Sequence, residues 1–206
     1  MNQKMKLHWS PKSPYVRKVM ICANELGLSD QIELIRSVAA MTKPNQLIMV
    51  DNPLSKIPTL VTTDGQSLFD SIVICEYLNQ IKSGPLFPSD QDRKWAVLRW
   101  QALGDGMMDT AILWRNERDE RAEPSSVLLE SFQIRILACL QMLEAEVDSI
   151  QSSPFSIAHI SLGCALGYLD YRFQNLNWRV YAPKLALFFE TLASRPSFKK
   201  TEPADG

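Results

Sequence analysis

Asp70 and Ser71 stand directly before the apolar periodicity that begins at Ile72, where the sequence predicts the start of a helix. The first backbone N–H groups of a helix have no partner within it and lie at its positive end, so they attract anions. A carboxylate beside such a site accepts a hydrogen bond from an ammonium group. Asp70 and Ser71 are therefore candidates for holding both charges of an α-amino acid. A simple helix cap uses the same residue types, and both interpretations stay open.

Ser13 stands at a second predicted helix start, in the loop before Pro14. Proline is favoured in the first turn of a helix, and the helix start again favours negative charge on a bound group. Ser13 can therefore face an anionic ligand atom, or it can serve only as a turn or capping residue. Ser10 lies three residues upstream in the same loop and is the alternative candidate.

A strand, a helix and a second strand position these serines. Residues 6–9 read as a strand, residues 14–27 as a helix that stops at a glycine, and residues 32–35 as another strand. Strand, helix and strand in so short a span predict a parallel pair joined by a crossover helix. The next segment, 39–51, is irregular or weakly helical.

A hairpin then leads to the helix start at residues 70–71. Pro58 opens the apolar strand 59–61, which is one of the few places where a strand accepts proline. Asp-Gly at 64–65 predicts a tight turn before the return strand 66–69. The resulting order, β-α-β-(α)-β-β-α, is that of a thioredoxin-like domain.

Residues 83–89 are rich in Pro, Gly and Ser and predict a linker. It divides the chain into an α/β thioredoxin-like domain at 1–82 and an all-α helical-bundle domain at 90–206. Only helical patterns follow the linker, at 90–118, 125–150, 156–169 and 184–194.

Ile57-Pro58, the hairpin and Asp70-Ser71 together resemble the glutathione-binding half of glutathione transferases. The two-domain plan is also similar to that family, so the resemblance covers nearly the whole chain. It implies a cis bond before Pro58 and a backbone contact from Ile57 to the cysteinyl part of glutathione. It also implies that Asp70 and Ser71 bind the γ-glutamyl head.

Ser13 resembles the active residue of serine-type glutathione transferases, which donates a hydrogen bond to the glutathione sulfur and favours the thiolate. That thiolate then attacks an electrophilic carbon. In thioredoxin-like folds a C-x-x-C motif stands here; Ser13 and Val16 occupy its two cysteine positions, so dithiol chemistry is not available. Lys43 and Lys56 are candidates for binding the glycyl carboxylate, although isolated lysines are more often solvated charges.

The same resemblance puts the second, hydrophobic substrate on the first helix after the linker. That helix is rich in apolar and polarizable side chains, most of which we expect in the core. Met107, Ala111 and Trp114 are the candidates for lining the pocket. Arg115 and Arg118 are either its rim or plain surface.

The family implies conjugation of glutathione, as co-substrate, to small hydrophobic electrophiles by a homodimer. One alternative keeps glutathione but changes the reaction to isomerisation, dehalogenation or peroxide reduction. The other is a non-catalytic binding or regulatory protein on the same fold. The sequence does not identify the electrophile.

Composition narrows the possible partners and the compartment. A net charge of −1 gives no electrostatic case for nucleic acid or an anionic membrane. No apolar run approaches the roughly 20 residues of a membrane span, and the first residues lack the apolar core of a signal peptide. The cysteines are far apart, with no metal-site spacing, which predicts free buried thiols in a reducing cytoplasm; they are Cys22, Cys75, Cys139 and Cys164.

His159 marks a local departure from the family pattern, which is Ser/Thr-x-x-Asp at residues 156–159. That pattern is a capping box, and this chain keeps Ser156 but has His159 in place of the acid. A carboxylate accepts from the capping N–H better than an imidazole, so the pattern predicts that His159→Asp stabilises the fold. Neither His8 nor His159 is expected to be catalytic.

Overall fold

The computed structural model describes residues 3–205 of the 206-residue chain. The chain forms two compact units, one of Met1–Phe87 with Ser197–Gly206 and one of Pro88–Pro196. The sequence placed all of 90–206 in the helical domain. In the structure the residues from Ser197 onward pack with the first unit, through contacts such as Ser197 Oγ to Glu25 Oε1 at 2.5 Å.

A four-stranded sheet in the order β2-β1-β3-β4 forms the centre of the first unit. β1 (Met5–Trp9) pairs in parallel with β2 (Ile32–Arg36) and antiparallel with β3 (Thr59–Val61), which pairs antiparallel with β4 (Ser67–Leu68). The predicted thioredoxin-like order of elements is confirmed. β1 is an internal strand of the sheet. Its neighbouring residues Leu7 and His8, which lie on opposite faces of the sheet, are therefore both buried.

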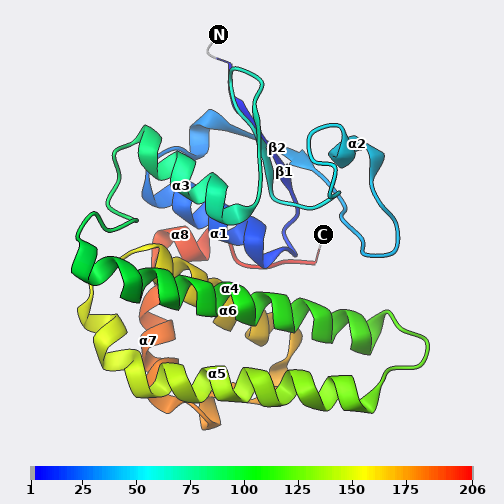
Figure 1. Ribbon diagram of the computed structural model, residues 1–206, viewed down its shortest axis with the longest axis vertical. Helices are drawn as coiled ribbons and strands as arrows, with labels where there is room; N and C mark the ends of the chain where they lie inside the picture. The colour runs from blue at the N-terminus through cyan, green and yellow to red at the C-terminus, as the bar shows by residue number, and fades with distance from the viewer. Residues whose placement is uncertain (1–2, 206) are drawn as a thin grey trace. The chain divides into compact units, whose positions relative to one another are not determined.

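α1 (Pro14–Glu25) and α3 (Ser71–Ile81) pack against each other on one side of this sheet (Figure 1). α2 (Gln46–Met49) lies apart from them, on the other side (Figure 1), and the short helix η1 (Ser29–Gln31) leads into β2. α1 ends before Gly27, whose φ of +66° is the left-handed conformation that glycine adopts most easily.

Long helices make up the second unit: α4 (Gln91–Asp119), α5 (Ser126–Ser152), α6 (Ile157–Arg172) and α7 (Pro183–Ala193). α4 and α5 run side by side (Figure 1). Two short helices, η2 (Gln174–Leu176) and η3 (Trp178–Val180), join α6 to α7, and α8 (Pro196–Lys199) follows. α6 is the core of this unit, because every residue from Ile157 to Leu169 is buried.

α4 and α6 approach each other closely at Gly104. A Cβ atom at this position would lie 2.8 Å from both the backbone carbon and the Oγ of Ser161. Only glycine avoids that overlap, so Gly104 sets the spacing of the two helices. Gly106, on the same helix, has no atom within 4 Å of the corresponding position.

The imidazole of His159 completes the capping box of α6. Its Nδ1 accepts from the backbone N–H of Ser156 at 3.2 Å, and its Nε2 donates to the carbonyl of Ile150 at 3.1 Å. Burial lowers the pKa of His159. A carboxylate could not make the Ile150 bond, so the structure removes the reason to expect that His159→Asp stabilises the fold.

None of the four cysteines forms a disulfide within the described residues; three are buried and Cys139 is half-buried. No group of three His, Cys, Asp or Glu side chains within residues 3–205 is arranged to hold a metal ion. By length and composition alone, α5 could cross a membrane, although the sequence predicted no such span. Glu130 and Arg135 interrupt the apolar run, but they do not make the helix polar on average. One such helix is weak evidence, since core helices of bundles pass the same test.

Candidate glutathione site

Ser13 and Ser10 lie in one tight turn at the start of α1. Ser13 Oγ accepts from the Val16 backbone N–H at 3.3 Å, so Ser13 is the N-cap of the helix. Its own backbone N–H donates to the Ser10 carbonyl at 3.3 Å, and Ser10 Oγ accepts from Lys12 N at 3.4 Å. Capping uses a lone pair of the Ser13 oxygen, so its hydroxyl hydrogen can still be donated to a ligand.

Both serines line a cavity of about 120 Å³. Its walls come from the β1–α1 loop, from α1, from Leu34 on β2 and from the segment after α8. The lining residues are Trp9, Ser10, Pro11, Ser13, Val16, Arg17, Met20, Leu34, Lys200, Thr201 and Glu202. The sequence did not point to Arg17 or to residues 200–202, because their role depends on a fold-back that no local pattern shows.

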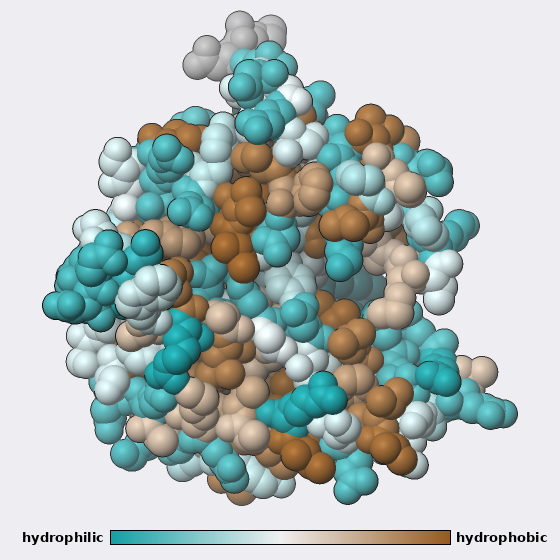
Figure 2. Space-filling model, viewed as in Figure 1, coloured by the Kyte–Doolittle hydropathy of each residue, from teal (hydrophilic) through white to brown (hydrophobic). Residues whose placement is uncertain are grey.

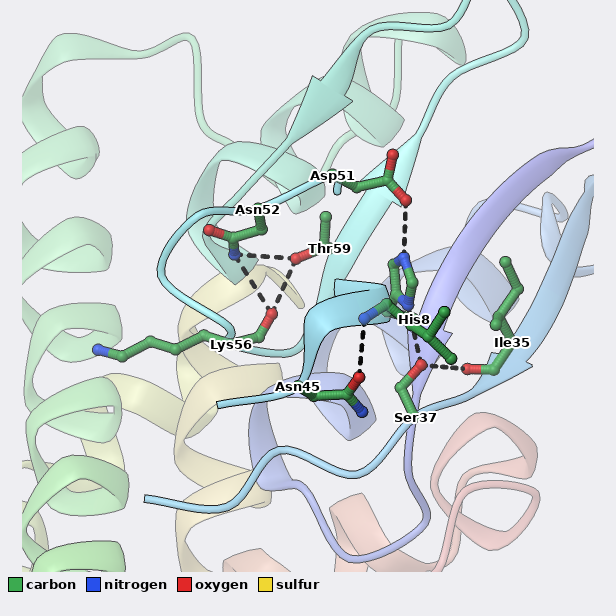
Figure 3. A network of polar contacts seen from close by, with 9 residues as sticks. His8, Ile35, Ser37, Asn45, Asp51, Asn52, Lys56 and Thr59 are labelled. Atoms are coloured by element: carbon green, nitrogen blue, oxygen red, sulfur yellow. Dashed lines mark hydrogen bonds and ion pairs between the residues drawn. The ribbon is translucent and has the colours of Figure 1, made fainter. Parts of the chain in front are cut away.

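The turn before Pro58 is held by the buried side chain of Asn52 (Figure 3). Its Nδ2 donates to the Lys56 carbonyl at 3.2 Å and to Thr59 Oγ1 at 2.9 Å, while its Oδ1 accepts from Leu54 N at 3.0 Å. The Ile57–Pro58 peptide bond is cis, as the family resemblance implied. The Asn52-Pro53 dipeptide, which is typical of turns, was the available sequence signal for this turn.

His8 braces the same region from the central strand (Figure 3). Its Nδ1 lies 2.8 Å from Ser37 Oγ and its Nε2 lies 2.9 Å from Asp51 Oδ2. These are the residue types of a Ser-His-Asp triad. The Ser37 hydroxyl, however, is buried and donates to the Ile35 carbonyl at 3.1 Å, so it is not presented to a substrate. The trio is a buried structural network.

At the start of α3, Asp70 rather than Ser71 is the N-cap. Asp70 Oδ1 accepts from Ile72 N at 2.9 Å, and the residue is exposed, so its second carboxylate oxygen is open to a ligand ammonium group. Ser71 is buried and its hydroxyl makes no hydrogen bond within residues 3–205. The pair is therefore a cap that retains unused acceptor and donor capacity.

Lys43 and Lys56 are both exposed on the segment that carries α2 and the Asn52 turn. Neither makes an ion pair with any described residue. The Lys56 side chain extends away from the network around Asn52 (Figure 3). Their predicted role toward a glycyl carboxylate stays a prediction.

In the helical unit all three candidate substrate residues are buried. Met107 and Ala111 are each 1% exposed and Trp114 is 8% exposed. Trp114 lines a cavity of about 650 Å³ formed with Arg118, Asp119, Gln133 and residues 171–176. Its ring lies 4.5 Å from that of Phe173.

The cavity beside Trp114 contains a matched pair of charges. Arg118 donates to both carboxylate oxygens of Asp119, at 2.6 and 2.9 Å. This contact holds the pKa of Asp119 below its ordinary value. The carboxylate therefore stays ionised and neutralises Arg118, while Arg172 is a second guanidinium in the wall of the same cavity.

Residues 12–81 match the family model described as glutathione S-transferase, N-terminal domain. Over 203 residues the chain is 34% identical to the uncharacterized GST-like protein YibF of Escherichia coli (strain K12), covering 97% of this chain and 98% of that protein. The chain belongs to the glutathione S-transferase family.

Solved structures of other glutathione transferase family members share this fold throughout. One from Pseudomonas fluorescens Pf-5, with bound glutathione, is 40% identical with a TM-score of 0.95, covering 98% of this chain and 100% of that one. A second structure from the same organism, with bound S-(propanoic acid)-glutathione, is 40% identical with a TM-score of 0.90 over the same shares. The predicted glutathione transferase fold is therefore confirmed.

Proposed function

We propose that the protein is a glutathione transferase that joins the thiolate of glutathione to a small electrophile. The observation that carries this proposal is the position of Ser13. Its hydroxyl caps α1, lines a cavity and keeps a hydrogen to donate. The glutathione and the S-substituted glutathione bound by the two Pseudomonas relatives support the assignment of both co-substrate and product class.

In this proposal glutathione binds to the first unit, at the turn before Pro58 and at the start of α3. The Ile57 backbone, beside cis Pro58, pairs with the cysteinyl part. Asp70 accepts from the γ-glutamyl ammonium group, and Ser71 with the start of α3 binds its carboxylate. Lys43 and Lys56 attract the glycyl carboxylate.

The reaction then requires only that the glutathione thiol loses its proton and that its sulfur accepts one hydrogen bond. The glutathione thiol loses its proton to solvent, and the Ser13 hydroxyl donates to the resulting thiolate at the positive end of α1. The sulfur attacks the electrophilic carbon and forms a thioether, while the bond from that carbon to the leaving group breaks and its electron pair departs with the leaving group. The S-(propanoic acid) group on the relative's ligand is a thioether of this kind, and it supports electrophiles that carry an acid.

Met107, Ala111 and Trp114 remain the proposed contacts for the apolar part of the second substrate. A homodimer in the cytoplasm is proposed on the family resemblance alone. Light scattering at micromolar concentration tests the dimer, and a monomer there would contradict it.

Calorimetric titration with glutathione, followed by turnover with a panel of electrophiles, tests the function. Ser71→Ala should weaken glutathione binding by roughly one to two decades, because it removes a hydrogen bond to a charged group. Unchanged affinity in both Ser71→Ala and Asp70→Ala would contradict the site. Binding without turnover of any electrophile would instead favour a binding or regulatory protein.

A further inference from the structure

Arg17 is a buried guanidinium that lies one helical turn after Ser13. It is 7% exposed, and its backbone N–H donates to the Ser13 carbonyl at 3.0 Å. Residues four apart share one face of a helix, and both side chains line the cavity of about 120 Å³. A permanent positive charge therefore lies beside the residue proposed to hold the glutathione sulfur.

No carboxylate within residues 3–205 pairs with Arg17. Its Nη2 donates to the Phe198 carbonyl at 3.4 Å, and its guanidinium carbon lies 5.6 Å from the centre of the Phe198 ring. Its Nε has no hydrogen-bond partner. A buried charge without a counter-ion is costly, and an anionic ligand would supply what the protein does not.

The cavity is much smaller than the several hundred Å³ that hold a drug-sized molecule, so it fits a small group and not a tripeptide. None of Ile57, Pro58, Asp70 and Ser71 lines it. The cavity is therefore separate from the proposed peptide contacts, and Ser13, the residue proposed to hold the glutathione sulfur, lies in its wall.

The charges around the cavity also favour an anion. Arg17 and Lys200 are cations in its wall, against one carboxylate, Glu202. Lys200 and Glu202 are exposed to solvent, whereas Arg17 is not. Nearby, Lys12 pairs with Asp205 at 3.8 Å, so that acid already has a partner. Arg17 is thus the charge least screened by water.

We propose that the second substrate carries a carboxylate close to its reacting carbon and that Arg17 binds it. This rests on the proposed transferase function and names its substrate class as small acid-bearing electrophiles. With a haloacid, the thiolate sulfur forms a C–S bond as the C–halogen bond breaks. The halide leaves with the bonding pair, and the carboxylate stays bound to Arg17 throughout.

Two product analogues of nearly equal shape test the proposal by calorimetry: S-carboxymethylglutathione and its neutral amide, S-carbamoylmethylglutathione. The wild type should bind the acid at least about tenfold more tightly than the amide, on the scale of a charge-assisted hydrogen bond. Arg17→Gln should abolish that preference and leave affinity for glutathione itself within about threefold. Arg17→Lys should keep part of the preference, because it keeps the charge.

Lys200→Gln is the matched control, since it removes the other cation of the same wall. It should leave the acid-to-amide ratio within about threefold, because an exposed charge is screened. In a turnover assay with iodoacetate and iodoacetamide, the acid-to-amide ratio of kcat/KM should fall in Arg17→Gln and stay within about threefold of wild type in Lys200→Gln. Comparing ratios between variants cancels the intrinsic reactivity of the two reagents.

The outcomes separate this inference from the proposed function. Failure of the wild type to bind glutathione would defeat the transferase proposal. Glutathione binding without a preference for the acid would overturn the role of Arg17, even if Arg17→Gln did not fold. Loss of the preference for the acid in Lys200→Gln would also overturn the role of Arg17. So would an Arg17 variant that changes only the ionisation of the bound thiol.

Discussion

The Nε2 atom of His8 lies 2.9 Å from Oδ2 of Asp51, so the central strand is tied to the residue before the buried Asn52. Asp51→Ala should lower the free energy of unfolding by about 1–3 kcal/mol, because the buried His8 loses a hydrogen-bond partner. It should also weaken glutathione binding severalfold, since the turn that presents Ile57 is less firmly held. Urea unfolding and calorimetric titration measure the two effects.

Asp51→Asn is the matched control for this prediction. It keeps the size and one oxygen acceptor, so it should recover most of the stability and affinity. Equal stability of Asp51→Ala and the parent protein would show that the His8 contact does not hold the segment.

Ser13→Ala should raise the pKa of the bound glutathione thiol by about one unit, equivalent to about 1.4 kcal/mol of lost thiolate stabilisation. Turnover at neutral pH should fall and the rate profile should move to higher pH, with little change in glutathione affinity. The pH dependence of kcat/KM measures this. If Ser10→Ala produces the shift and Ser13→Ala does not, the role belongs to Ser10.

Gly104→Ala and Gly106→Ala should change stability in opposite directions. A methyl group at 104 meets the Ser161 backbone at 2.8 Å, and overpacking of this kind costs about 1–3 kcal/mol. At 106 the methyl meets nothing, so the gain in helix propensity of up to about 1 kcal/mol should appear. Thermal unfolding of the two variants compares them directly, and equal effects would contradict the close approach of α4 and α6.

His159 should make stability depend on pH. Burial, and to a lesser degree the charge of Arg195, lower its folded-state pKa below the ordinary value, while the Ile150 carbonyl opposes the shift. The unfolded chain therefore binds more protons, so this contribution is full above about pH 6.5 and is lost as pH falls toward the folded pKa. His159→Gln does not titrate and should flatten that decline. Urea unfolding at pH 7.5 and 5.5 gives the comparison.

A parallel decline in His159→Gln and the parent protein would assign the pH dependence to other groups. At neutral pH, His159→Asp should be less stable than the parent by about 1 kcal/mol, because it cannot donate to Ile150. A more stable His159→Asp variant would show that the capping half of the contact dominates.

The order and type of the major elements could be predicted because local patterns specify them. Pro14 marks the first turn of α1, the Asp64-Gly65 turn separates β3 from β4, and Gly27 ends α1 in a left-handed conformation. The fold-back of residues 197–205 could not be predicted. It depends on contacts between residues about 180 positions apart, such as Arg17 and Phe198, which leave no periodic signal.

The candidate site was only partly visible in the sequence for the same reason. Ser13 and Asp70 stand directly before predicted helix starts, and this position indicates capping residues. Arg17 reads as an ordinary charged residue of a helix, and only the structure shows that it is buried beside Ser13 without a counter-ion. The hydrogen bond from His159 to the Ile150 carbonyl could not be predicted either, because Ile150 lies on the preceding helix.

The packing of Phe198 onto Arg17 has a consequence for synthesis on the ribosome. The two residues are 181 positions apart, so at 5–20 residues per second roughly 9–36 s pass between their translation. During that interval the nascent first unit lacks the segment that covers its arginine, and the whole helical unit is made meanwhile. We expect the first unit to mature after the second, against the usual order in which the domain translated earlier folds first.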